Sequence, residues 1–514
     1  MRRSDSCFTW MIRSLSMAIA HTYTRAILGV DSPLILVEAD ISNGLPQMQI
    51  VGMADGKMRQ ARERIKSAIK NAGFKLPDRK ITINLSPADI PKDVSSFDLP
   101  IALAILKASQ QIPDTPVEDY CSMGELALDG KILLSPGILP ASIACHEAKM
   151  KLIIPELNQA EGALLASPYL FSANHLTEAA TDACTCCQPC HNNRLSEIIS
   201  PTAITLDQIK GQEHAKRALI IAATGQHHLL MVGPPGAGKT LLAKSLVTLL
   251  PPLDFKEQLE IGCIRSANGT RYDDNSGMHR PFRSPHHTAS AAAMAGGGNP
   301  PKPGEISLAH QGVLFLDELP EFSPSVIETL RQPLESGCIE ISRAHFRIKY
   351  PARFQLLAAM NPCPCGWHGS LNHACECGFE KIRKYQQRIS GPILDRLDMQ
   401  IQVPALPPAA LLKKHKTVQP SQQQKAQQKI LEGYQIRKKR QACLPRTEDT
   451  ESIITACKLS GKHQVFANLL ATKLSMSARG FTRLLKVARS IADLELADEV
   501  KKHHLEEALS FRKL

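Results

Sequence analysis

The residues best suited to chemistry in this chain form a glycine-rich loop. The loop follows an apolar run at 229–232 and precedes a stretch with helical spacing at 241–247. Its members are Gly233, Pro234, Pro235, Gly236, Ala237, Gly238, Lys239 and Thr240. Between a strand and a helix, this spacing turns backbone N–H groups toward a phosphate chain, and the helix N-terminus adds its positive end. Lys239 is then placed to reach the β- and γ-phosphates and Thr240 to hold Mg²⁺, so we predict a nucleoside triphosphate site.

A pair of acidic side chains is expected beside this loop. The apolar run 312–316 is followed directly by Asp317 and Glu318. In open α/β sheets, ligands bind at the carboxyl ends of the strands, which is where these two acids would lie. Asp317 would complete the Mg²⁺ shell, and Glu318 would act as general base toward the attacking water. The alternative is a strand that ends in a solvated acidic pair, which the preceding phosphate loop disfavours.

Three polar residues farther along the chain are candidates for contacting the γ-phosphate. Asn361 follows another apolar run, 354–360, although an ordinary Asn-Pro turn is the alternative interpretation. Arg396 is a candidate arginine finger supplied to a neighbouring subunit, and its alternative role is an ion pair with a flanking aspartate. Arg479 is expected on a helical lid that folds onto the nucleotide, with Arg483 as its rival.

Two short pairs of cysteines, which we call hooks, follow Asn361. They consist of Cys363 and Cys365, then Cys375 and Cys377. Four thiolates from two paired hooks suit a structural Zn²⁺ tetrahedron, although the spacing is one residue tighter than the usual knuckle. The alternatives are free buried cysteines, a redox pair or, less well matched, an iron–sulfur cluster.

The elements that must position these residues fall into five parts. They are a tail (1–16, with Met17 as an alternative start), an α+β domain (17–175), a cysteine-rich linker (176–200), a domain of alternating strands and helices (201–405), and a linker followed by helices (406–514). Alternating strands and helices are typical of a parallel sheet. The linker has a thiol cluster of its own, with Cys184, Cys186, Cys187, Cys190 and His191. Both a second metal site and a metal-free linker are open interpretations of it.

Composition restricts the class of protein. The chain of 514 residues carries a net charge of +12, which favours a polyanionic partner but also serves solubility. It contains 15 Cys and no recognisable secretory signal, so we expect reduced thiols and metal ligands in a cytoplasmic protein. No apolar run reaches the roughly 18 residues that a membrane span needs, so we expect no membrane partner.

Two segments are candidates for contacting a polyanionic partner such as DNA. His286 and His287 lie in a stretch rich in glycine and proline, and a predicted hairpin at 339–349 alternates apolar residues with basic ones. The basic residues of the hairpin are Arg343, Arg347 and Lys349. Basic tips that contact phosphates bind strongly but without sequence preference. The alternative is a solvated basic face.

The order of the motifs resembles that of a known family. The phrases GPPGAGKT, GVLFLDELPEF, AAMNPCPCG, SGPILDRLD and SARGFTRLLKVARSIADL are similar to those of the ComM/YifB family, the magnesium-chelatase-like AAA+ ATPases. The resemblance implies an α/β fold, with a P-loop AAA+ domain built on a parallel sheet and a C-terminal helical lid. It places Walker A at Lys239 and Thr240, Walker B at Asp317 and Glu318, sensor 1 at Asn361, the finger at Arg396 and sensor 2 at Arg479. It also implies ATP as cofactor and a homo-hexameric ring helicase that promotes DNA branch migration in natural transformation and recombination, with other recombination proteins as further partners.

The first domain resembles the Lon-type protease domain. Ser96 falls on the position of the nucleophile, but Leu139 falls where the catalytic lysine should be. Because a hydroxyl needs a base to act as a nucleophile, and Lys92 in the same loop offers no evident geometry, we expect an inactive scaffold or a platform for DNA or partner proteins. Two alternatives to a DNA motor remain. One is a metallochelatase-type motor subunit, and the other, which Leu139 disfavours, is an ATP-dependent protease.

Overall fold

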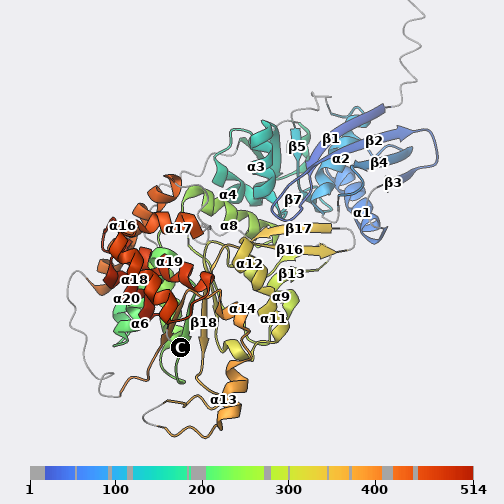
Figure 1. Cartoon of the computed structure of the whole chain (residues 1–514). Coiled ribbons are helices and arrows are strands. Elements are labelled where there is room, and N and C mark those ends of the chain that lie inside the picture. The colour runs from blue at the N-terminus through green and yellow to red at the C-terminus, as the bar shows by residue number, and fades with distance from the viewer. Residues whose placement is uncertain are drawn as a thin grey trace, which may run out of the picture.

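The computed structural model describes most of the chain (Figure 1). The described ranges are 18–51, 55–90, 95–112, 120–181, 185–186, 204–270, 279–298, 301–343, 346–369, 373–407, 421–443 and 450–512. The predicted tail 1–16 with Met17, Lys92, the linker residues Cys184, Cys187, Cys190 and His191, and the side chains of Cys186 and Arg343 lie outside what is described. The N-terminal sheet, in blue, lies at the upper right of the view, and the C-terminal helices, in red, lie at the left (Figure 1).

The N-terminal part is built on a mixed eight-stranded sheet in the spatial order β10-β9-β8-β5-β1-β2-β4-β3. Its strands are β1 Ala18–Arg25, β2 Leu34–Ser42, β3 Gln47–Val51, β4 Lys80–Ser86, β5 Tyr120–Ser122, β8 Lys151–Pro155, β9 Leu170–Ala173 and β10 Thr185–Cys186. A small hairpin joins β6 Glu125–Leu126 to β7 Ile132–Leu133. Side chains of β2 alternate between buried and partly exposed, as in a strand with one face on a core.

Five α-helices accompany this sheet in the described part of the chain. They are α1 Asp55–Asn71, α2 Asp98–Ala108, α3 Ile138–Ala148, α4 Gln159–Gly162 and α5 Leu176–Ala180. Helix α2 is apolar on every side, and all but one of its residues are buried. A helix of this kind belongs inside a domain, and α2 packs on β1 and β2. The mixture of strands and helices confirms the predicted α+β composition of this part.

The central part is a five-stranded parallel sheet in the order β12-β15-β18-β11-β19. The strands are β12 Phe282–Arg283, β15 Val313–Leu316, β18 Gln355–Met360, β11 Leu229–Val232 and β19 Met399–Gln402. Every residue of β11, β15 and β18 is buried, which explains why their sequences are apolar apart from Gln355 at the start of β18. The predicted parallel sheet is therefore confirmed.

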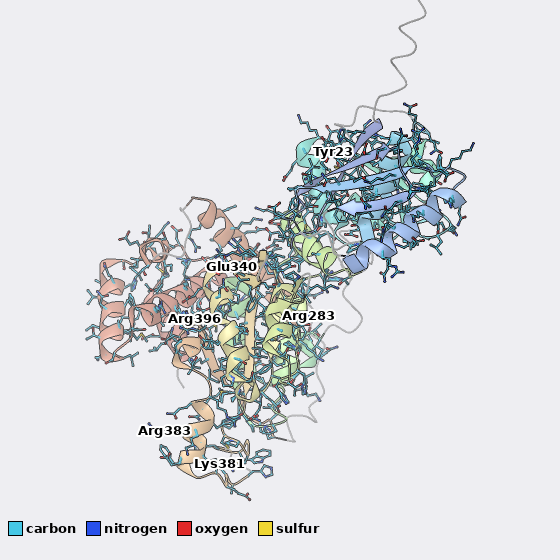
Figure 2. The ribbon with its side chains drawn as sticks, turned by 90° about the vertical axis from the view of Figure 1, so that its right-hand side faces the viewer. Tyr23, Arg283, Glu340, Lys381, Arg383 and Arg396 are labelled. Carbon is cyan, nitrogen blue, oxygen red and sulfur yellow. The ribbon has the colours of Figure 1, made fainter. Side chains whose placement is uncertain are left out.

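Helices and two short hairpins surround this sheet. The helices are α6 Glu213–Gly225, α7 Lys239–Leu249, α8 Phe255–Ala267, α9 Ala291–Ala295, α10 Glu305–Leu308, α11 Pro324–Thr329, α12 Arg331–Ser336, α13 Phe379–Gln386 and α14 Gly391–Leu394. The hairpins pair β13 Gly296–Gly297 with β14 Lys302–Pro303, and β16 Cys338–Arg343 with β17 Phe346–Pro351. Lys381 and Arg383 of α13 lie at the end of the molecule far from Tyr23 of the N-terminal sheet (Figure 2).

The C-terminal part consists of helices that share a core with the parallel sheet. They are α16 Gln422–Cys443, α17 Thr450–Cys457, α18 Gly461–Lys473, α19 Ala478–Leu494 and α20 Lys502–Ser510. Helices α16 and α19 pack on α6, and the Gln400 N–H donates to the Phe511 carbonyl at 2.6 Å. These helices therefore lie against α6 and the edge at which β11 and β19 begin. Among the helices that the structure describes, none combines the length and apolar character needed to cross a bilayer.

The N-terminal part rests on the parallel-sheet part through α3 and α8. The Gly137 N–H donates to the Ser266 carbonyl at 3.2 Å. A Cβ placed at Gly262 would lie 2.5 Å from Leu139 Cδ2, so the two helices approach as closely as a glycine permits. Gly29 makes a similar approach to Ile348 of the β16–β17 hairpin, where a Cβ would lie 2.6 Å from Ile348 Cγ2.

Candidate nucleotide-binding site and cysteine cluster

The glycine-rich loop connects the buried strand β11 to the N-terminus of α7. Gly236 and Gly238 adopt φ angles of +73° and +88°, a region that other residues rarely occupy. No heavy atom among the described residues would lie within 4 Å of a Cβ at either position, so space remains above the loop. Gly233 has a different role, because a Cβ there would lie 2.1 Å from the Val403 carbonyl oxygen. The loop is thus held close to the end of β19 and open on the side where a phosphate chain would lie.

Lys239 is the best-connected side chain of the loop. Its ammonium group donates to the carbonyl oxygens of Gly233 at 2.6 Å and Pro234 at 3.0 Å, and to Asn361 Oδ1 at 3.1 Å. Burial lowers the pKa of Lys239, and the charges of Asp317 and Glu318 oppose this shift. The ammonium group therefore lies between the loop, the sensor strand and the two acids.

The acidic pair and Thr240 complete one edge of the site. The Thr240 hydroxyl donates to Asp317 Oδ2 at 2.9 Å, and Asp317 Oδ1 accepts from the Glu318 N–H at 3.0 Å. Hydroxyl and carboxylate oxygens are ligands that suit Mg²⁺, so Thr240 and Asp317 fit this ion. The structure thus brings together Lys239, Thr240, Asp317, Glu318 and Asn361 at the carboxyl ends of β11, β15 and β18, as the sequence indicated.

His287 lies beside Glu318, which sequence reasoning did not anticipate. His287 Nδ1 is 3.5 Å from Glu318 Oε2, and its ring lies 4.1 Å from that of His286 and 6.5 Å from that of Phe322. Glu318 itself has a φ of +52°. The sequence indicated His287 only as a DNA contact. Its approach to Glu318 depends on tertiary packing, and we find no sequence signal that would have revealed it.

The three candidate arginines lie away from this edge. Arg396, Arg479 and Arg483 line a cavity of about 550 Å³ beside the residues that precede β11 and β19. The phosphate loop follows β11, so the cavity and the loop lie at opposite edges of the sheet. The structure therefore does not bring Arg479 to the loop of its own chain, contrary to the expectation of a lid folded onto that nucleotide. The physical reason is that α19 packs on α6 instead.

Charged groups line this cavity and pair with one another. Arg396 is buried and donates to the Pro392 carbonyl at 2.7 Å and to Glu335, so its partner is not a flanking aspartate. Asp398 accepts from the His228 N–H at 2.9 Å and lies 3.6 Å from Arg483. Burial would raise the pKa of Asp398, but the neighbouring His227, His228 and Arg483 lower it below its usual range. The carboxylate is therefore ionised and holds Arg483 at the wall of the cavity.

The hairpin candidates for DNA are only partly free. The predicted hairpin is confirmed by the pairing of β16 with β17, and Ile348 and Tyr350 face the core while Arg347 and Lys349 are exposed. Arg347 donates to Glu340 at 2.8 Å and 3.2 Å, so much of its charge is compensated within the hairpin. Lys349 remains exposed opposite Glu340 in the register.

The two cysteine hooks meet, as their spacing indicated. One sulfur atom from each of Cys363, Cys365, Cys375 and Cys377 lies within 4.8 Å of all the others. Three of the separations are 3.3, 3.7 and 3.6 Å. A tetrahedron with metal–sulfur bonds of about 2.3 Å has edges of about 3.8 Å, so the four thiols fit Zn²⁺ in both number and distance.

The candidate protease residues do not form a dyad. The Ser96 hydroxyl is buried, and no hydrogen-bond partner for it lies among the described residues. Leu139 is fully buried against α8, and its N–H donates to Glu161 at 3.2 Å. Because no base reaches the hydroxyl in the described part of the chain, this geometry does not activate a nucleophile.

Comparison with known proteins agrees with this site. The family model described as magnesium chelatase, subunit ChlI, matches residues 205–411. Two further models, described as subunit ChlI of Mg-chelatase and as the C-terminal part of that subunit, match residues 37–158 and 420–512.

Individual proteins match over almost the whole length. The uncharacterized protein YifB of Salmonella typhimurium is 43% identical over 502 residues, which cover 97% of each chain. Competence protein ComM of Haemophilus influenzae is 42% identical over 509 residues, which cover 96% of this chain and 98% of that protein. A shorter match, 28% identical over 233 residues, covers 40% of this chain and 42% of Lon protease 2 of Bacillus subtilis. With its phosphate loop, acidic pair and full-length relatives, this chain belongs to the ComM/YifB family of magnesium-chelatase-like AAA+ proteins.

Proposed function

We propose that this protein is an ATP-driven DNA motor that works as a hexameric ring. The observation that carries the proposal is the separation of two half-sites on one chain. Lys239, Thr240 and Glu318 lie at one edge of the parallel sheet, and the arginine-lined cavity lies at the other. An arginine that stabilises the γ-phosphate can be supplied by a neighbouring subunit. Such an arginine requires that one edge of a subunit meets the opposite edge of its neighbour. Head-to-tail contacts between subunits close into a ring, and each interface then holds one complete site.

Within each site, the residues have distinct roles in this proposal. Thr240 and Asp317 hold Mg²⁺, which neutralises developing negative charge on the phosphates. Glu318 accepts the proton of the attacking water, and Asn361, which already contacts Lys239, senses the γ-phosphate. Arg396 acts as the finger in trans, with Arg479 or Arg483 beside it. The four thiols hold a structural Zn²⁺.

We propose DNA as the substrate of the motor, and branch migration during natural transformation or recombination as its task. The net charge of +12 and the exposed Lys349 support a polyanionic partner. A relative named for competence, matched over 96% of this chain, supports the biological setting. The Lon-like N-terminal domain serves as a scaffold without peptidase activity, because Leu139 and the isolated Ser96 provide no dyad in the described part of the chain.

A metallochelatase-type motor is the alternative, because the matching family models describe magnesium chelatase subunits. ATPase measurements with and without forked or four-way DNA distinguish the two. A DNA motor should hydrolyse ATP faster in the presence of such DNA and should bind it. If DNA neither stimulates hydrolysis nor binds to the protein, the proposed substrate is refuted.

Mixing two inactive variants tests the shared site. Arg396→Ala should bind ATP but hydrolyse it about 10³-fold to 10⁵-fold more slowly, because loss of a trans arginine has this effect. Glu318→Gln should also bind ATP and stall. In mixed rings some interfaces pair an intact finger with an intact base, so activity should partly return. Arg331→Ala, on the exposed surface of α12, is the matched control and should hydrolyse ATP normally. No recovery while subunits demonstrably exchange would remove Arg396 from the site.

A further inference from the structure

The cysteine cluster touches the phosphate loop directly. Gly366, in the turn between the two hooks, has a φ of +87°, and its N–H donates to the Cys363 carbonyl at 3.0 Å. A Cβ placed there would lie 2.6 Å from Pro235 Cδ and 2.8 Å from Pro235 Cγ. Only a glycine therefore allows the cluster to approach Pro235 at this distance.

The turn that makes this contact is tied to the thiols. Cys365 precedes Gly366 directly, Cys363 lies three positions before it, and the His368 N–H donates to the Cys363 sulfur at 3.3 Å. A metal bound to all four sulfurs would join both hooks into one rigid unit, since each ligand is fixed by the others. The position of Gly366 would then be set by the metal and not by the loop alone.

The same unit follows the sensor residue. Asn361 precedes Cys363 by two positions, and its side chain accepts from Lys239 at 3.1 Å. On the other side, Gln386 of α13 donates to the Pro362 carbonyl at 3.1 Å. The cluster is thus connected to the nucleotide site twice, through Pro235 in the phosphate loop and through Asn361 at the end of β18.

We propose that the metal-loaded cysteine cluster is a positioning element of the nucleotide site, with Gly366 as the residue that transmits its position to the phosphate loop. This inference rests on the proposed ATP site and the proposed Zn²⁺, and it assigns the zinc a task beyond folding its own loop. Because coupling between two sites is reciprocal, metal should raise nucleotide affinity and nucleotide should retain the metal.

A pair of glycine variants tests the contact. Gly366→Ala introduces the clash with Pro235, whereas Gly369→Ala does not, since no described atom lies within 4 Å of a Cβ there. The two positions have similar φ angles of +87° and +76°, so both variants strain the backbone alike. In the full-length protein, prepared without oxygen, Gly366→Ala should retain its zinc and bind a fluorescent ATP analogue ~5-fold or more weakly. Gly369→Ala should bind like the wild type.

Metal release provides a second measurement that needs no variant of the turn. The wild type should release zinc to a chelator several-fold more slowly with Mg²⁺ and ATP present than without them. Lys239→Ala, which weakens nucleotide binding, should lose this protection. Equal release rates with and without ATP would overturn the inference even if Gly366→Ala did not fold.

The outcomes separate this inference from the proposed function. Wild-type protein that binds ATP but carries no zinc, or identical ATP affinities of the two glycine variants, would overturn the positioning role alone. Wild-type protein that does not bind ATP would overturn the proposed function and this inference with it. Weak ATP binding by Gly366→Ala together with loss of its zinc would indicate a damaged cluster. The release of zinc from the wild type would then decide, with protection by ATP supporting the inference and equal release rates overturning it.

Discussion

The contact between Gly262 and Leu139 allows a quantitative test of how the N-terminal domain is joined to the ATPase core. Gly262 lies within α8, where replacing glycine by alanine normally stabilises a helix by about 1 kcal/mol. Here the new Cβ would lie 2.5 Å from Leu139 Cδ2. Overpacking a buried site usually costs about 1–3 kcal/mol, and the fully buried Leu139 cannot turn into solvent.

The two effects together predict a net loss. Gly262→Ala should be destabilised by up to about 2 kcal/mol, the overpacking cost less the gain in helix propensity. Leu139→Ala removes buried methyl groups and should cost about 2–5 kcal/mol alone. In the double variant, the methyl group added at position 262 fills part of the space that the truncated Leu139 side chain leaves. The two changes should therefore be less costly together than their sum, with a coupling of at least about 1 kcal/mol.

Urea unfolding of the four proteins, with proteolysis of the native state as a second readout, measures this coupling. Gly262→Ala should also be cut faster between the N-terminal domain and the core. A Gly262→Ala variant at least as stable as the wild type would refute the reasoning, because only the helix propensity would then be acting. Strictly additive losses would show that the two helices are not in contact in solution.

Two further predictions concern other parts of the chain. His287→Ala frees Glu318 from a partner 3.5 Å away, so DNA-independent ATP hydrolysis should rise several-fold and the stimulation of hydrolysis by DNA should become smaller. His286→Ala, at the exposed neighbouring residue, is the control and should change little. Equal hydrolysis rates in both variants and the wild type would contradict this role of His287. Burial raises the pKa of Asp98 to about 6 despite two hydrogen bonds from Arg64 at 2.8 and 3.2 Å. Since this folded-state pKa exceeds the ordinary value of 3.8, the contribution of Asp98 to stability is greatest below about pH 4 and is lost as the pH rises through 6, by up to ~3 kcal/mol. The urea midpoint of Asp98→Asn should lack this dependence between about pH 4.5 and pH 7, and parallel curves for the two proteins would count against it.

The sequence predicted the local parts of the site well, because each combines a periodic pattern with a chemical motif. The apolar runs before Gly233, Asp317 and Asn361 are buried strands, and their parallel pairing brings the motif residues to one edge. The four hook cysteines meet because short spacings leave few arrangements. These features depend on neighbours in the chain or on the rule that parallel strands end at the same edge.

Contacts between distant elements could not be predicted in this way. The approach of Gly366 to Pro235 and of His287 to Glu318 joins segments that are distant in the sequence, and neither follows from hydrophobic periodicity. The element on which the C-terminal helices pack is likewise set by tertiary contacts and not by the local sequence. An amphipathic helix specifies that it must bury a face but not which partner covers that face.

The packing of α19 on α6 bears on whether the arginines contact the nucleotide of their own chain or that of a neighbouring subunit. Bringing Arg479 to the phosphate loop of its own chain would require α19 to leave α6. The movement would break the hydrogen bond between His227 and Ser490, at 2.8 Å, and the ion pair between Arg217 and Glu507, also at 2.8 Å. It would also expose the apolar residues that α6 and α19 bury together, at ~25 cal/mol per Å². A neighbouring subunit that presents its phosphate loop to the cavity disturbs none of these contacts. The packing of the C-terminal helices therefore supports the proposal that the arginine set acts on the ATP of a neighbouring subunit.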